Sequence, residues 1–264
     1  MHPGSIPGEA SNSHNGLRSG SGRYCMGQGA QLAPQPGEYD MSGDFEQRRV
    51  KMVDGQLRTT DVTSASVLDA MLSVPREEFV PRSRAELAYI DEDILVADAA
   101  PGAPARYLME PSPFGKLVQL AEIGPGDFVL DVGCATGYSS AVLSLLASSV
   151  VALECDETLA AGATEKLTEL GYDNVAVVTG ALQAGCPDEA PFDVIIVGGA
   201  VDKVPDELLG QLRDGGRLVA VVGHGNAGAA HVFYNAGGVV TGRKAFNAAV
   251  RPLPGFEQVA EFQF

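Results

Sequence analysis

Positively charged residues are scarce in this chain of 264 residues. Lys and Arg number 18 against 34 Asp and Glu, which gives a formal net charge of −16 at pH 7. A surface of this sign repels the phosphates of nucleic acids and of anionic lipids, so neither a nucleic-acid partner nor a membrane partner is expected. Long apolar runs are also missing, because no segment of the sequence reaches the roughly 18 uncharged apolar residues that a membrane span needs.

Cysteine is rare as well. The four cysteines form no C-x-x-C pair, and the four histidines are not clustered. These spacings predict neither a metal site nor a disulfide framework. Unpaired thiols are typical of a reducing compartment, which favours the cytoplasm. The N-terminus lacks the basic start and apolar core of a signal peptide, and it has too few basic residues for a transit peptide.

Residues 1–40 differ in composition from the rest of the chain. Gly, Ser and Pro supply 17 of these 40 residues, and the apolar residues follow no period. Such a segment buries too little surface to offset its ordering entropy, so we expect a disordered tail. Met41 opens the region with structural patterning and is an alternative start of translation. The folded domain is therefore expected to cover residues 41–264.

Amphipathic segments come first in this domain, and alternating strands and helices follow them. The strand segments are almost continuously apolar, which is typical of a parallel sheet covered on both faces. The sequence thus predicts an α/β fold: a Rossmann-like, doubly wound, mostly parallel sheet with an N-terminal helical extension and an antiparallel C-terminal edge hairpin. Helices are expected at 44–58, 63–75, 83–88, 111–124, 137–147, 156–170 and 205–213, strands at 127–133, 149–154, 174–180, 192–199 and 216–223, and loops at 91–93 and 97–106.

A glycine-containing loop, DVGCATG, spans residues 131–137 between a predicted strand and a predicted helix. Gly133 permits a tight turn, Gly137 allows close packing, and the amides at the start of the helix face a ligand. The spacing differs from G-x-G-x-x-G, which counts against a dinucleotide-dependent oxidoreductase. It is close to D-x-G-x-G-x-G, the loop of class I S-adenosylmethionine-dependent methyltransferases, with Ala135 at the middle glycine.

An acidic residue follows this loop at the distance typical of nucleoside sites. Glu154 ends the next predicted strand and could accept hydrogen bonds from both ribose hydroxyls. Asp131 could attract a sulfonium or ammonium group. Cys134 lies beside a helix N-terminus, where the pKa of a thiol can fall, although a small buried apolar role fits it better.

The region from about 44 to 254 resembles protein-L-isoaspartate O-methyltransferases. Several stretches carry the resemblance, in the family's order: MVDGQLR (52–58), VPREEFVP (74–81), LAYIDE (87–92), IGPGDFVLDVGCATGYSSAVLS (123–144), PFDVIIVGGAVDKVPDELLGQLRDGGRLVAVVG (191–223) and VRPLPGF (250–256). The resemblance implies methyl transfer from S-adenosylmethionine to the α-carboxylate of an isoaspartyl residue in a damaged protein. It also implies cofactor contacts from Asp131, Gly133, Cys134, Ala135, Gly137, Tyr138, Glu154, Cys155, Ala181 and Leu182.

Four positions depart from the family pattern. A family segment like G-Q-T-I-S-Q-P corresponds here to residues 105–111, where Tyr107 replaces the threonine and Met109 replaces the serine that faces the substrate. Arg106, in the same segment, could hold the carboxylate instead. Ala181 replaces an acid that contacts the adenine, and Ala135 replaces a glycine. The catalytic residues therefore stay undefined. Isoaspartyl repair, methyl transfer to another acceptor, and a weak or inactive homologue that acts by binding all remain open.

Overall fold

The structure is a computed structural model, and it describes residues 41–101 and 103–257, all within one compact unit, Asp40–Phe264. The expected tail at 1–40 and Cys25 lie outside these residues, and the alternative start, Met41, is the first of them. The expected domain boundary therefore stays a prediction.

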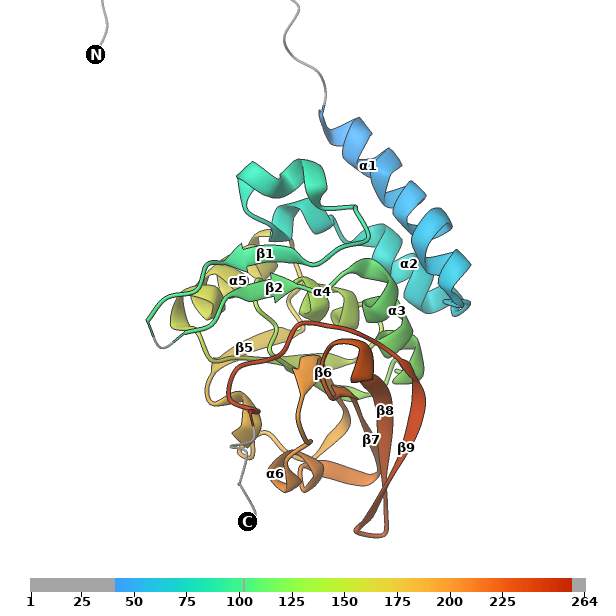
Figure 1. Cartoon of the computed structure of the whole chain (residues 1–264), viewed down its shortest axis with the longest axis vertical. Helices are drawn as coiled ribbons and strands as arrows, with labels where there is room; N and C mark the ends of the chain where they lie inside the picture. The colour runs from blue at the N-terminus through green and yellow to red at the C-terminus, as the bar shows by residue number, and fades with distance from the viewer. Residues whose placement is uncertain (1–40, 102, 258–264) are drawn as a thin grey trace, which may run out of the picture. The chain divides into compact units, whose positions relative to one another are not determined.

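A seven-stranded sheet forms the centre of the unit (Figure 1). Its order is β5-β4-β3-β6-β7-β8-β9; the first five strands are parallel, β8 pairs antiparallel with β7, and β9 pairs antiparallel with β8. The predicted doubly wound sheet with an antiparallel edge hairpin is confirmed. The strands are β3 (Phe128–Val132), β4 (Ser149–Glu154), β5 (Val175–Thr179), β6 (Phe192–Val201), β7 (Leu212–Val222), β8 (Ala229–Ala236) and β9 (Val239–Asn247).

The strand order reverses between β3 and β6. From β3 the chain moves outward through β4 and β5, and it then returns to pair β6 with the other side of β3. In open α/β sheets, ligands bind at such a point, beyond the carboxyl ends of the strands. The two segments that meet there are the loop after Val132 and the end of β6.

Alternating apolar side chains of these strands enter two separate cores. On one face, Val129, Val194 and Ile196 pack with the helices of the N-terminal half, and on the other face Leu130 and Ile195 pack against the opposite layer. All five side chains are fully or almost fully buried. Burial on both faces explains why the strand segments are almost continuously apolar.

The expected helical extension is present. It begins with α1 (Met41–Met52), continues in one π-helical turn (Val53–Leu57), and is followed by α2 (Ala65–Ser73) and α3 (Pro111–Leu120). Residues 82–87 form a 3₁₀ helix close to the short helix expected at 83–88. The helices that alternate with the strands are α4 (Tyr138–Ser144), α5 (Glu157–Glu169) and α6 (Asp206–Leu209).

Two predicted segments differ from the structure. Next to the expected loop at 97–106, the chain forms a two-stranded antiparallel sheet of β1 (Ile94–Ala97) and β2 (Arg106–Leu108). The helix expected at 205–213 ends at Leu209, and β7 begins at Leu212. The buried Gln211 side chain lies between them and bonds to Cys186 N at 2.8 Å and Ala184 O at 2.7 Å, which fixes the chain to the turn before β6.

The segment after β9 returns to the end of β6 (Figure 1). The backbone N–H of Ala200 donates to Arg251 O at 2.9 Å, and the N–H of Leu253 donates to Ala200 O at 2.9 Å. The Leu253 side chain is buried and packs over Gly133 of the first loop. The last described part of the chain therefore closes one side of the strand-order reversal.

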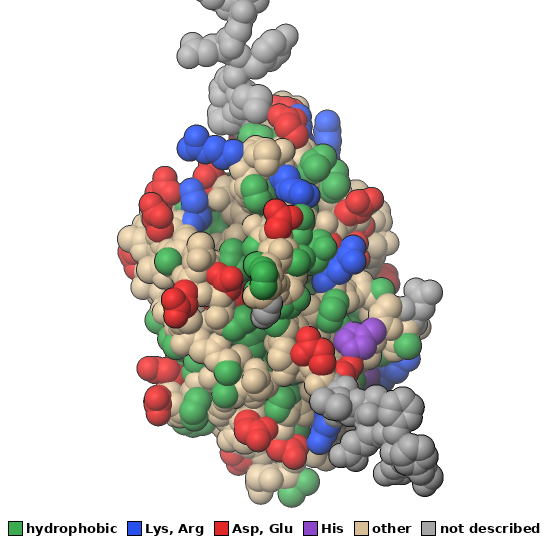
Figure 2. All heavy atoms as spheres, turned by 60° about the vertical axis from the view of Figure 1, so that its left-hand side comes forward, with side chains coloured by type: hydrophobic (Ala, Val, Ile, Leu, Met, Phe, Trp, Pro, Cys, Tyr) green, Lys and Arg blue, Asp and Glu red, His purple; other side chains and the backbone are tan. Residues whose placement is uncertain are grey.

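Charges of both signs are mixed on one face of the molecule. In the view of Figure 2, acidic side chains are scattered among basic and apolar ones and do not form one patch. No helix within residues 41–101 and 103–257 is long and apolar enough to cross a membrane.

We expect opposite effects from alanine at two glycines. A Cβ at Gly199 would lie 2.8 Å from Arg251 O and 2.7 Å from Leu253 Cγ, so Gly199→Ala must displace the 250–253 segment and should cost about 1–3 kcal/mol of unfolding free energy. A Cβ at Gly162 in α5 meets nothing within 4 Å, so Gly162→Ala should stabilise by about 0.5–1 kcal/mol. Urea unfolding of both variants measures this. Equal effects would contradict the tight docking of the segment.

Candidate active site

The loop after β3 is a strained, tightly anchored turn. Gly133 and Gly137 have φ angles of +86° and +94°, and Ala135 between them has φ +49°. The left-handed region costs a residue with a side chain roughly 1–2 kcal/mol, so glycine is the natural choice at such positions and Ala135 carries strain. The N–H groups of Gly133 and Cys134 both donate to Leu153 O, at 2.8 and 3.2 Å, which ties the loop to β4.

A small cavity lies where the loop meets the carboxyl ends of β3 and β6. Its volume is about 20 Å³, room for about one water molecule and far below the roughly 300 Å³ of the smallest typical ligand pockets. Of the residues expected to bind a cofactor, five line it: Asp131, Gly133, Cys134, Ala135 and Tyr138. Tyr107 and Met109 line it too, together with apolar side chains that the sequence did not single out, Leu108, Phe114, Leu117, Ile196 and Val197.

Asp131 is a fully buried carboxylate on this cavity. Its Oδ2 accepts hydrogen bonds of 2.6 Å from the hydroxyls of Ser139 and Ser140, whereas its Oδ1 has no partner among the described residues. Burial raises the pKa of Asp131 to about 6 although the two serine hydroxyls lower it. An unpaired buried carboxylate oxygen favours a cationic ligand group, because such a group would satisfy the oxygen and restore the ionised form.

Glu154 ends β4 and is also fully buried, but it has many partners. Its Oε2 accepts from Arg106 Nη2 and from the Ala135 N–H, both at 2.8 Å. Its Oε1 accepts from Arg106 Nη1 and from the N–H groups of Cys155 and Asp156, at 2.8 and 3.1 Å for the latter two. Burial alone would raise the pKa of Glu154, but the guanidinium and the backbone donors outweigh it and hold the pKa below its usual value.

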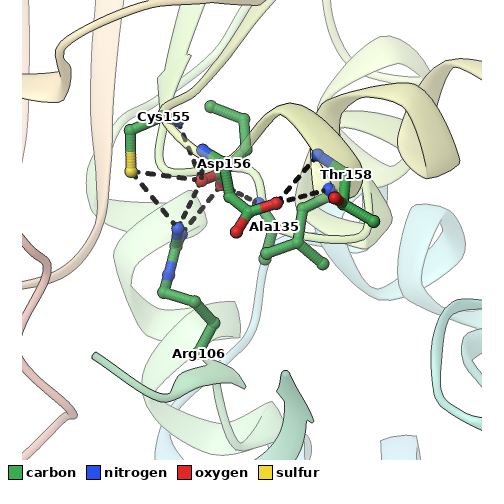
Figure 3. A network of polar contacts seen from close by, with 7 residues as sticks. Arg106, Ala135, Cys155, Asp156 and Thr158 are labelled. Atoms are coloured by element: carbon green, nitrogen blue, oxygen red, sulfur yellow. Dashed lines mark hydrogen bonds and ion pairs between the residues drawn. The ribbon is translucent and has the colours of Figure 1, made fainter. Parts of the chain in front are cut away.

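Figure 3 shows Arg106 reaching from its strand to two neighbouring segments, the loop after β3 with Ala135 and the chain after β4 with Cys155. The sequence suggested that Arg106 could hold a substrate carboxylate and that Glu154 would hold a ribose. In the structure the two side chains hold each other in a forked, buried ion pair. The spacing that predicted Glu154 as a nucleoside ligand gave no sign of this partner, which lies 48 residues earlier in the chain.

The other predicted contacts are divided between the cavity and its surroundings. Tyr138 is fully buried, with its ring beneath the Arg76 guanidinium at 4.7 Å. Burial and the nearby carboxylates raise the pKa of Cys134 well above its usual value, so this thiol is not an activated nucleophile. Cys155 is exposed, and Ala181 is exposed, while Leu182 is buried in the opposite core. Gly137, Glu154, Cys155, Ala181 and Leu182 do not line the cavity as it stands.

The segment that departs from the family pattern forms another part of the wall. Met109 is almost fully buried, and its carbonyl accepts a 2.7 Å hydrogen bond from the buried Arg76. The Arg251 guanidinium lies 4.8 Å from the centre of the Tyr107 ring and pairs with Asp93 at 3.3 Å. The position of Arg251 beside the cavity followed from no local sequence signal, because only the tertiary fold returns this segment to β6.

Acidic residues gather around Glu110, the last residue before α3. Burial, reinforced by Asp93, Asp91 and Glu92, raises the pKa of Glu110 to about 7. The loop expected at 91–93 is present, with Asp91 and Glu92 exposed and Asp93 half-buried, and two of its carboxylates also bond to the start of α3. Asp93 accepts from the Glu110 N–H at 3.1 Å, and Asp91 accepts from the Ser112 hydroxyl at 2.8 Å.

A family model described as "Protein-L-isoaspartate(D-aspartate) O-methyltransferase (PCMT)" matches residues 47–253. The chain belongs to this family. A protein-L-isoaspartate O-methyltransferase of Koribacter versatilis is 38% identical over 216 residues, which cover 82% of this chain and 94% of that protein. A relative of the same name from Pelotomaculum thermopropionicum is 39% identical over 175 residues, which cover 66% of this chain and 74% of that protein.

Solved structures agree with the family and the fold. A protein-L-isoaspartate O-methyltransferase matches with a TM-score of 0.68 and 28% identity, over 78% of this chain and 66% of that one. A putative family member from Plasmodium falciparum, solved in complex with S-adenosyl-L-homocysteine, matches with a TM-score of 0.64 and 18% identity, over 77% of this chain and 96% of that one, and shows the same fold. The PCMT family thus has the methyltransferase architecture that the glycine loop predicted.

The raised pKa of Glu110 predicts a pH dependence of stability. A carboxyl group whose pKa rises on folding stabilises the protein while it is protonated in both states, and this contribution is lost as pH rises through its folded pKa. We therefore expect the melting temperature to fall between pH 5 and 8, with Asp131 contributing in the same direction. In Glu110→Gln the decrease should be smaller. Thermal unfolding at four or five pH values measures it, and an unchanged slope would show that Glu110 does not titrate in this range.

Proposed function

We propose that this chain transfers a methyl group from S-adenosylmethionine to the α-carboxylate of L-isoaspartyl residues in damaged proteins. The observation that carries the proposal is the PCMT family match over residues 47–253. The geometry at the reversal of strand order supports it, because a buried carboxylate oxygen without a partner and a glycine turn meet there. The proposed partner is an isoaspartyl protein or peptide.

Several residues suit the cofactor. Asp131 Oδ1 would pair with a cationic group of the cofactor. The backbone of the loop from Gly133 to Gly137 would approach the cofactor closely, because glycine has no side chain to block it. Glu154 is placed to accept from the ribose hydroxyls once its oxygens are released from Arg106. Tyr138 forms the floor, while Cys155, Ala181 and Leu182 are proposed for the adenine side by their order along the chain. When bound, the cofactor supplies a methyl group attached to a positively charged sulfur.

For methylation of a carboxylate, the protein needs only to position the acceptor and to exclude water. A carboxylate whose ordinary pKa is about 3.9 is already ionised at neutral pH and needs no general base. The protein's part is to align it with the methyl carbon and to exclude water, which weakens nucleophiles by solvating them. The buried apolar walls from Leu108, Phe114 and Ile196 suit this task.

We also propose that the protein works in a reducing compartment, the cytoplasm, and does not bind nucleic acid. The first proposal is supported by the free thiols of Cys134, Cys155 and Cys186. The second is supported by the net charge of −16.

Asp131→Asn tests the cofactor site. The variant keeps the size of the side chain but removes the charge, so its Kd for S-adenosylhomocysteine should rise at least tenfold, a loss typical of one charge-assisted contact. Isothermal titration measures the affinity, and methanol release after methylation of an isoaspartyl peptide measures turnover. The same peptide with normal aspartate is the control acceptor. Wild-type protein that binds no S-adenosylhomocysteine at millimolar concentration would contradict the proposed activity.

Met109→Ser tests the substrate side of the cavity. A hydroxyl at this almost buried position would donate to the substrate carboxylate, and a hydrogen bond to a charged group contributes about 1.5–3 kcal/mol. Turnover of the isoaspartyl peptide should therefore increase tenfold or more, with unchanged affinity for S-adenosylhomocysteine. Met109→Ala, which makes the same space without a hydroxyl, is the matched control. Equal gains in both variants would mean that space, and not the hydroxyl, limits the reaction.

A further inference from the structure

Glu154 has no accepting capacity left for a ligand in the described fold. A carboxylate offers about four lone-pair directions. Five N–H donors already point at its two oxygens: two from the Arg106 guanidinium, and one each from the backbone of Ala135, Cys155 and Asp156. A ribose diol that bonds to Glu154 must therefore replace at least one of these donors.

Only one of these partners can leave while the turn stays intact. The three N–H groups belong to the loop after β3 and to the chain directly after β4, and Leu153 O fixes that loop through two more hydrogen bonds. Arg106 donates from a long side chain on β2, a three-residue strand of a separate two-stranded sheet. Rotation of its side chain frees Glu154 without a change in the backbone of the large sheet.

Arg106 also occupies volume at this site. Its side chain is only 6% exposed, and through Glu154 it is linked to Ala135, which lines the small cavity. It lines a second small cavity of about 10 Å³, and Tyr107, Met109 and Gly198 are common to both cavities. The second cavity is also lined by Arg251 and Asp93, which pair with each other at 3.3 Å.

We propose that Arg106 competes with the cofactor ribose for Glu154 and thereby sets the affinity for the cofactor. The inference rests on the proposed cofactor site. In the ion-paired form Glu154 is closed to the ligand, and binding selects molecules in which Arg106 has turned away. The apparent Kd then equals the intrinsic Kd divided by the fraction of molecules in the open form. An arginine outside the catalytic chemistry would thus be an affinity-determining residue of this chain.

Arg106→Gln is the direct test. Glutamine is neutral and shorter, so it cannot reproduce the forked ion pair, and every molecule offers Glu154 to the ribose. Isothermal titration with S-adenosylhomocysteine should show at least a tenfold decrease in Kd relative to wild type. Arg106→Lys keeps the charge but not the fork and should lie between the two. Circular dichroism and thermal unfolding of each variant confirm that it is folded at the temperature of the titration.

Arg217→Gln is the matched control. Arg217 is a half-buried arginine on β7 that pairs with Asp127 at 2.7 Å and with the carbonyl of Ala121 at 2.6 Å, and it does not line either cavity. Its loss should leave the Kd unchanged. If wild type binds and Arg106→Gln binds equally or more weakly while folded, the competition is refuted and the proposed function stands. If neither wild type nor Arg106→Gln binds at millimolar ligand, both the proposed function and the competition are refuted.

Discussion

The forked ion pair between Arg106 and Glu154 determines how the candidate site is closed. A carboxylate with no exposed surface requires compensation, since an unpaired buried charge is strongly destabilising. The guanidinium supplies it, and in doing so it connects the small β1–β2 sheet to the carboxyl edge of the large sheet. The same contact fills the volume beside the glycine turn. Arg106 therefore stabilises the ligand-free chain and, by the same contact, blocks access to Glu154.

Asp131 and Glu154 end neighbouring strands, yet their environments differ. Asp131 has two short serine contacts and one unsatisfied oxygen, and burial dominates its pKa. Glu154 has a cation and three backbone donors, and these dominate its pKa. Two carboxylates of the proposed cofactor site thus differ in their capacity to accept a further hydrogen bond. Asp131 has one oxygen without a hydrogen-bond partner, which a cationic group could satisfy. Both oxygens of Glu154 already accept hydrogen bonds, so a ligand must displace one of its donors.

Much of the fold could be predicted from local pattern. The apolar runs place β3 to β7 within a few residues, and β4 was predicted with its observed ends, because strands buried on both faces leave a signal that needs no partner. The β1–β2 sheet was missed, since strands of four and three residues carry almost no period. The helix before β7 was predicted too long, because the bonds of the Gln211 amide to a distant turn override the local helical pattern.

The site was predictable where it is local to one turn, because five of the six expected contact residues in or directly after DVGCATG line one cavity. Contacts between distant segments were not, and the segment at 250–253 is the clearest case. Its Leu253 lies over Gly133, 120 residues earlier in the chain, and is hydrogen-bonded to β6. A chain that emerges from the ribosome from its N-terminus can pair β3 with β4 early, but this wall of the site can form only after residues 250–253 have also emerged. Nascent chains that stop before residue 250 would carry the complete glycine turn without its cover.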